Sequence, residues 1–190
     1  VWANSGSSIY GQIPVNPGLN LISGTLNTGD TLESIGLTNN FGLTTTSPAG
    51  TYTLNVDDSS LDPTYVLVEW QPGQFIIQPA LLTVTALYQA KTYGDDLTGQ
   101  VPVLGTHFSV SGLQNSEVVD GVTLTSAGYA PTASVAGSPY TITPSNPTDS
   151  TGSGFNVNNY AITFNNGLLT VNPALLTVTA LYQAKTYGDD

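Results

Sequence analysis

The chain carries only two basic side chains, Lys91 and Lys185, which lie 94 positions apart in identical surroundings. A lysine at the end of a strand can form an intramolecular isopeptide bond with an Asn or Asp side chain when an acidic group shuttles the proton. The alternative is a surface ion pair with the neighbouring acidic turn at Asp95 and Asp96, which contributes about 0–1 kcal/mol. The residue types allow either role.

Acidic residues form two short groups in which calcium could bind. These are Asp57 and Asp58 with Asp62, and Asp95 with Asp96. Carboxylate oxygens suit Ca²⁺, which commonly stiffens junctions between extracellular repeats. However, the sequence has no D-x-[DN]-x-[DN]-G loop, and Asp also favours solvated turns through hydrogen bonds to the backbone. Calcium is therefore the one cofactor that we consider possible.

Residues for catalysis are few. The chain has one histidine, His107, and no cysteine, so a Ser-His-Asp triad could occur only once and a thiol nucleophile is excluded. Glu33, Glu69 and Glu117 share no position between the two halves of the chain. Because an active site is not usually copied along a tandem array, we expect no enzymatic activity.

Trp70 is the best single candidate for ligand recognition. It lies beside a predicted turn at 71–73 and has no counterpart in the second half of the chain. Its ring could stack on a sugar, or it could simply pack against the core. The polar stretch 144–154, PSNPTDSTGSG, is predicted as a surface loop and is a second candidate. A glycan- or protein-binding module near either place is the alternative function.

Composition excludes nucleic acids as partners and disfavours anionic membrane surfaces. Only 8% of residues are charged, and 13 acidic against two basic residues give a net charge of −11. Such a chain repels nucleic-acid phosphates and anionic membrane surfaces. It also lacks an apolar run of about 18 residues, so we expect no membrane insertion.

The lysines and one acidic pair belong to an internal repeat. The 18 residues at 79–96, PALLTVTALYQAKTYGDD, recur unchanged at 173–190. Weaker matches pair Tyr10-Gly11 with Tyr93-Gly94, Ser23-Gly24 with Ser111-Gly112, Ala49–Leu54 with Ala136–Ile142, and Gly73 with Gly167. The sequence thus predicts unit one at 1–78, unit two at 79–172, and the first strand and turn of a third unit at 173–190.

Apolar and polar residues alternate with a period of two, as in half-buried strands. Runs at 82–86, 140–142, 160–164 and 169–171 show it. We therefore predict an all-β fold of tandem small antiparallel β-sandwich or β-grasp-like domains. Asn165–Gly167 is predicted to close a hairpin, as is 71–73 in unit one. The segments 26–34 and 113–120 could form a turn or two of helix.

The junctions between units are short. Gln78-Pro79-Ala80 and Asn172-Pro173-Ala174 leave about three residues between strands, and proline stiffens them. We therefore expect a semi-rigid rod. The segment 174–190 is a first strand without the rest of its domain, so it should pair with a neighbouring unit or with another molecule by strand addition.

The order of motifs in unit two resembles the MBG ("mostly β, glycine-rich") repeats, which occur with the related YDG repeats in large bacterial surface adhesins of the filamentous-haemagglutinin type. The motifs are LTVTALYQAKTYGDD, SVSGLQNSE, YTIT and NNYAITFNNGLLTVNPA. Unit one departs from the pattern, with Ser8 at the lysine position and Gln12 in place of the aspartate after Tyr-Gly.

This resemblance implies a non-enzymatic stalk or adhesive repeat of an extracellular bacterial surface protein or filament. The absence of cysteine agrees with that location. The expected partners are neighbouring units of the same chain, identical chains in a fibre or by strand addition, and an unknown glycan or surface target.

Overall fold

The computed structural model describes residues 1–188, and it is built from short strands and three 3₁₀ turns. Within 1–78 the strands are β1 (Trp2–Ala3), β2 (Gly6–Ile9), β3 (Leu19–Asn20), β4 (Thr38–Asn39), β5 (Gly50–Leu54), β6 (Val56–Asp57) and β7 (Gly73–Gln78). Within 79–172 they are β8 (Ala80–Ala86), β9 (Gln89–Thr92), β10 (Phe108–Ser111), β11 (Gly121–Thr125), β12 (Tyr140–Thr148), β13 (Tyr160–Asn165) and β14 (Gly167–Asn172). The 3₁₀ turns are η1 (Ala127–Tyr129), η2 (Val135–Gly137) and η3 (Val157–Asn159). We keep the names unit one and unit two for residues 1–78 and 79–172.

One strand arrangement occurs in both units. In unit one β7 lies between β2, which runs parallel to it, and β5, which runs antiparallel. In unit two β14 lies in the same way between the parallel β9 and the antiparallel β12. The strand pairing of the weaker first copy is therefore the same as that of the second, although most of the sequence differs.

The all-β prediction is confirmed, but the three larger sheets are mixed, and only the two-stranded sheets β1–β3 and β4–β6 are purely antiparallel. Besides β2–β7 and β9–β14, β8 and β13 also pair in parallel, while β10 pairs with β8 antiparallel. Sequence alternation reports only which face of a strand is buried, and it carries no information on strand direction. The segments 26–34 and 113–120 form turns and contain no helix in the described chain.

The predicted hairpin at Asn165–Gly167 is wrong. β13 and β14 pair with different strands, β13 with β8 and β14 with β9 and β12. Asn166 is thus the point at which an extended segment crosses from one sheet to the other. In unit one the stretch 71–73 makes the same crossing, because Gln71 bridges to Trp2 while β7 pairs with β2 and β5.

Glycine is required at both crossing points. A Cβ at Gly167 would lie 2.6 Å from the Ala86 carbonyl oxygen, and one at Gly73 would lie 2.5 Å from that of Ala3. Both distances are far below contact distance, so a larger residue would push the two crossing segments apart. This close approach explains why Gly73 and Gly167 coincide in the two halves of the sequence.

The predicted loop at 144–154 is only partly a loop. β12 extends to Thr148 and pairs with β11, for example Leu124 with Pro144, whose side chain is fully buried. The polar and proline residues of this stretch hid the strand from sequence reasoning. Proline fits in β12 because Pro144 occupies a position that needs no ladder N–H.

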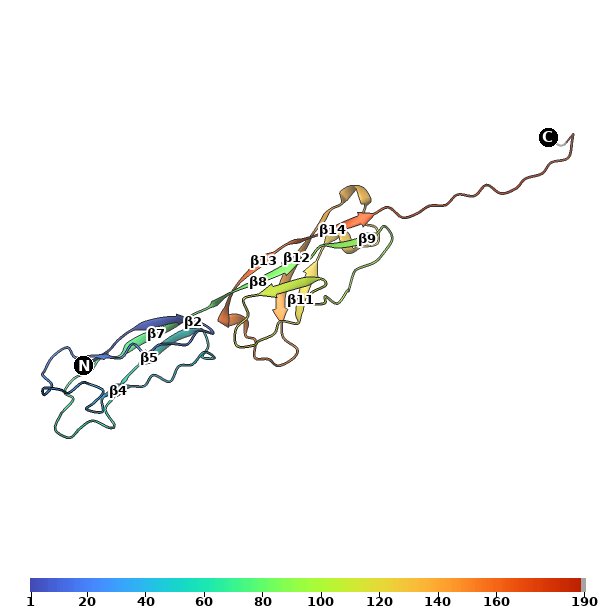
Figure 1. Cartoon of the computed structure of the whole chain (residues 1–190). Coiled ribbons are helices and arrows are strands. Elements are labelled where there is room, and N and C mark those ends of the chain that lie inside the picture. The colour runs from blue at the N-terminus through green and yellow to red at the C-terminus, as the bar shows by residue number, and fades with distance from the viewer. Residues whose placement is uncertain (189–190) are drawn as a thin grey trace.

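The two units are joined directly. Only Pro79 separates β7 from β8, and one apolar cluster contains buried residues of both units. Its members are Ala3, Tyr10, Leu54, Phe75 and Ile77 from unit one, with Ala80, Leu82 and Tyr160 from unit two. Figure 1 shows the units following one another along the chain, with the N-terminus at one end and the C-terminal segment projecting from the other.

Candidate functional site

The contact between the units is centred on the carboxylate of Glu117. This side chain lies in the turn between β10 and β11 and is buried. It accepts a hydrogen bond from the hydroxyl of Tyr10, at the end of β2, and one of 2.7 Å from the hydroxyl of Tyr160, at the start of β13. One carboxylate thereby joins residues that are 107 and 43 positions away from it. We call Tyr10, Glu117 and Tyr160 the joint.

The electrostatics of the joint favour protonated phenols. Burial, and then the hydrogen bond to Glu117, raises the pKa of the Tyr10 hydroxyl above its usual value near 10.0. Burial also raises the pKa of Tyr160, to which the Gln114 backbone N–H donates at 2.9 Å. Both phenols are therefore donors at neutral pH, as a buried carboxylate requires.

Aromatic and backbone contacts surround the joint. The Tyr10 and Tyr160 rings meet edge to face with centroids 5.6 Å apart. Across the boundary, the Asn115 side-chain amide donates to the Thr45 carbonyl at 3.0 Å, and the Ala49 N–H donates to the Asn159 side chain at 3.0 Å. These bonds add two direct contacts between the units beside the joint.

The Tyr-Gly step at the joint recurs in unit two. The Tyr10 N–H donates to Gln78, the last residue of β7, at 2.8 Å, and the Tyr93 N–H donates to Asn172, the last residue of β14, also at 2.8 Å. The following residues, Gly11 and Gly94, have positive φ angles of 85° and 100°. Tyr93 is half exposed, whereas Tyr10 is buried against unit two.

The comparisons agree with this repeated architecture. Residues 82–170, which contain Glu117 and the unit-two side of the joint, match the family described as MBG domain (YGX type). This segment is an MBG domain. No curated protein and no solved structure matches the chain. MBG domains are non-catalytic repeat modules typical of bacterial surface proteins, and no helix in the described residues is long and apolar enough to cross a membrane.

Lys91 of the MBG domain is buried, and among residues 1–188 it forms no ion pair with an acidic side chain. Its Nζ donates to three backbone carbonyls, those of Asp95 at 2.9 Å, Tyr129 at 3.2 Å and Ala130 at 2.5 Å. The ammonium group thus ties the Tyr-Gly turn to the η1 segment. An isopeptide bond would need an Asn or Asp side chain, and these three hydrogen bonds all go to main-chain oxygens. The isopeptide bond therefore stays a prediction.

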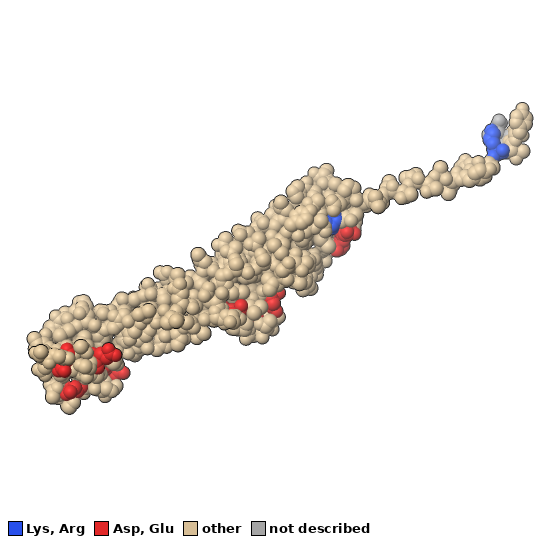
Figure 2. All heavy atoms as spheres, viewed as in Figure 1, with Lys and Arg blue, Asp and Glu red and all other residues tan. Residues whose placement is uncertain are grey.

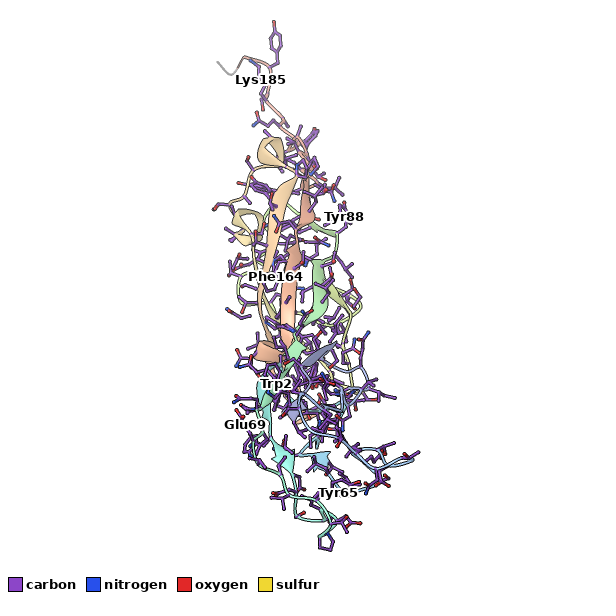
Figure 3. All side chains as sticks on the ribbon, turned by 90° about the vertical axis from the view of Figure 1, so that its left-hand side faces the viewer. Trp2, Tyr65, Glu69, Tyr88, Phe164 and Lys185 are labelled. Atoms are coloured by element: carbon purple, nitrogen blue, oxygen red, sulfur yellow. The ribbon has the colours of Figure 1, made fainter. Side chains whose placement is uncertain are left out.

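Lys185, the counterpart of Lys91, has a different environment. It lies in the C-terminal segment, where residues 173–186 have no regular secondary structure and every described side chain is exposed. Figure 3 shows it beyond the end of the MBG domain. Asp189 and Asp190, which complete the repeated sequence, lie outside the described residues.

The acidic residues proposed for calcium serve as turn caps. Asp62 accepts from the N–H and hydroxyl of Thr64, and Asp96 accepts in the same way from Thr98. These bonds lower the pKa of both carboxyl groups. Asp57 accepts from Ser59, and Asp95 accepts from the Thr92 N–H. Asp58 is exposed beside them.

Calcium binding at these positions stays a prediction. Over residues 1–188 no three acidic, histidine or cysteine side chains are grouped so as to hold a metal ion. Figure 2 shows acidic side chains gathered at the free end of unit one, with smaller groups along the MBG domain.

His107 and Trp70 lie apart from the joint. The Nδ1 atom of His107 accepts from the Val103 N–H at 2.9 Å, and its other nitrogen faces Gln100, so the ring closes a loop. Trp70 is 43% exposed next to the crossing at Gln71 and remains available for recognition.

Sequence reasoning missed the role of Glu117. One signal was available, because Glu117 is the only charged residue between Asp96 and Asp120. Its partner Tyr10, however, comes from the other unit. Spacing within one repeat could not reveal that pair.

Proposed function

We propose that the chain is part of the stalk of an extracellular bacterial surface protein, in which tandem β domains hold a distal binding region away from the cell. The observation that carries this proposal is the joint. A carboxylate shared by two units, inside an apolar cluster that spans both, resists bending far better than a flexible linker does. The family of the MBG domain supports the location.

Stiffness is the property that this function needs, and small-angle X-ray scattering of the full chain measures it. We expect the data to fit one elongated particle with units one and two in a fixed arrangement. The Glu117→Ala variant should then scatter as an ensemble of bent shapes. A wild-type chain that already scatters as two independently moving beads would contradict the proposal.

Recognition of a glycan or protein near Trp70 is the second candidate, and the exposed indole favours it. A glycan array probed with the full chain tests this role, with Trp70→Ala as the variant and Tyr88→Ala, a more exposed aromatic residue of unit two, as the control. Binding that is lost only in Trp70→Ala supports recognition in this unit. The loop at 149–154 is tested in the same way with Asp149→Ala.

A further inference from the structure

Strand β13 is an open edge of the sheet β10–β8–β13 in the MBG domain. On one side it pairs with β8 over six consecutive residues, 160–165. On the other side, no backbone hydrogen bond within residues 1–188 engages residues 161–165. Alternate residues of a strand direct their N–H and C=O groups to opposite sides, so a row of these groups is open along this edge.

The other edge strands of the MBG domain carry features that discourage pairing with another chain. The register of β11 is irregular between Gly121 and Thr123. β9 has four residues and contains the buried, charged Lys91, and β10 also has only four residues. Short strands, bulges, inward-pointing charges, proline and lysine are the usual protections of a sheet edge. β13 is longer, and its sequence Tyr-Ala-Ile-Thr-Phe-Asn contains no proline and no charge.

The core face of β13 is partly uncovered. Ile162 and Phe164 lie beside Leu82 and Val84 of β8. The two β8 side chains are 0% exposed, but Phe164 is 41% exposed, and Figure 3 labels it on the MBG domain. An open groove of about 570 Å³ is lined by these β13 side chains and by residues 145–147 of β12. Apolar surface beside an open strand edge is what a partner strand would cover.

The sequence around β13 is free of charged residues. Between Asp149 and Lys185 there is none, and residues 145–147 are uncharged as well. In Figure 2 the acidic side chains of the MBG domain lie on its lower edge and at its far end, and none is visible along the upper edge, where Figure 1 shows β13. For a chain with a net charge of −11, two copies can therefore meet here without repulsion between close charges.

We propose that β13 pairs with β13 of a second copy of this chain, antiparallel about a two-fold axis that passes through Thr163. The two three-stranded sheets then join into one sheet of six strands. Ile162 of each copy lies opposite Phe164 of the other on the core face, and the two Thr163 side chains meet on the outer face. Aromatic–β-branched and Thr–Thr pairs both stabilise neighbouring strands.

This register makes β13 complementary to itself, which is why we assign a second copy as its partner. It uses all five residues with open backbone groups, 161–165. Because the same surface is used by both copies, the contact closes on itself and gives a dimer. β13 runs from the unit-one end of the MBG domain toward the C-terminal end (Figure 1), so the two chains lie side by side in opposite directions. The inference adds lateral association to the proposed stalk and does not rest on it.

Sedimentation velocity up to about 1 mM chain tests the proposal, since even a weak dimer is populated there. We expect the wild-type chain to shift from monomer to dimer and to form nothing larger. Thr163→Glu should weaken dimerisation about tenfold or more, because two like charges then meet on the axis. Thr123→Glu is the matched control at an equally classed, exposed threonine of the edge strand β11, and it should dimerise as the wild type does.

Cysteine crosslinking tests the register. The chain has no cysteine, and opposite residues of antiparallel strands have Cα atoms about 4.5–5.5 Å apart, within reach of a disulfide. Thr163→Cys should therefore form a covalent dimer in mild oxidant. Ala161→Cys is exposed on the same face but lies opposite Asn165 of the second copy, so it should crosslink much more slowly.

Three results would overturn the proposal. They are a wild-type chain that is monomeric at all concentrations, equal effects of Thr163→Glu and Thr123→Glu, and crosslinking of Ala161→Cys as fast as that of Thr163→Cys. A monomeric chain would mean that the edge is covered by something other than a second copy. Because the joint lies within one copy, failure here leaves the scattering test of the stalk intact, and Thr163→Glu allows that test without dimers.

Discussion

The Glu117 carboxylate is buried between two phenols that come from different units. At the residue scale this has a direct energetic consequence. Glu117→Ala leaves two buried hydroxyls without an acceptor and should lower the free energy of unfolding by about 2–4 kcal/mol. Glu117→Gln keeps one acceptor oxygen and should cost about 1–2 kcal/mol. Denaturant unfolding measures both, with the exposed Glu33→Ala as a control that should change little.

The raised pKa values of Tyr10 and Tyr160 predict loss of stability in alkali. A group whose pKa is higher in the folded than in the unfolded state contributes its full stability below the unfolded value and loses it as pH rises above that value. The free energy of unfolding should therefore fall above about pH 10. Tyr10→Phe should make this decline shallower, and an unchanged slope would show that the phenol does not ionise at the joint.

The buried ammonium group of Lys91 predicts a strong local contribution to stability. Lys91→Met keeps most of the side-chain volume but leaves three carbonyl oxygens without their donor, and should lower the free energy of unfolding by about 3 kcal/mol. Lys185→Met, at the exposed counterpart, is the control. Intact mass spectrometry checks the isopeptide alternative, because that bond would release ammonia or water from the chain.

At the scale of the elements, the crossing between sheets depends on one missing side chain. Gly167→Ala would place a Cβ 2.6 Å from the Ala86 carbonyl oxygen, so the two crossing segments must separate. We expect a loss of about 2 kcal/mol or more in unfolding free energy. Gly42→Ala has open space around it and should be neutral or slightly stabilising. Equal effects in thermal or denaturant unfolding would contradict this explanation.

The strands themselves were readable from alternation, and their partners were not. The runs at 82–86 and 160–164 lie within β8 and β13, as predicted, yet these strands pair in parallel across about 80 residues. The Asn-Asn-Gly sequence has the chemistry of a hairpin turn, but its glycine is required by the close approach of Ala86. Local turn preference cannot distinguish these two reasons for a glycine.

At the scale of the whole molecule, the exact duplication of 79–96 predicted tandem units, and the pairing common to β2–β7–β5 and β9–β14–β12 agrees with a repeated unit. The candidate site was not predictable in the same way. Its carboxylate belongs to one unit and one of its phenols to the other, so it exists only where two units meet. A single repeat read by itself contains only part of the site.

The central claim is that the joint holds unit one and the MBG domain in one orientation, and a distance measurement across it tests that most directly. The chain has no cysteine, so spin labels can be placed uniquely at Thr53→Cys on β5 and Thr141→Cys on β12, both exposed. Pulsed electron paramagnetic resonance should then give one narrow distance distribution, which Glu117→Ala broadens. A broad distribution in the otherwise wild-type chain would contradict the account.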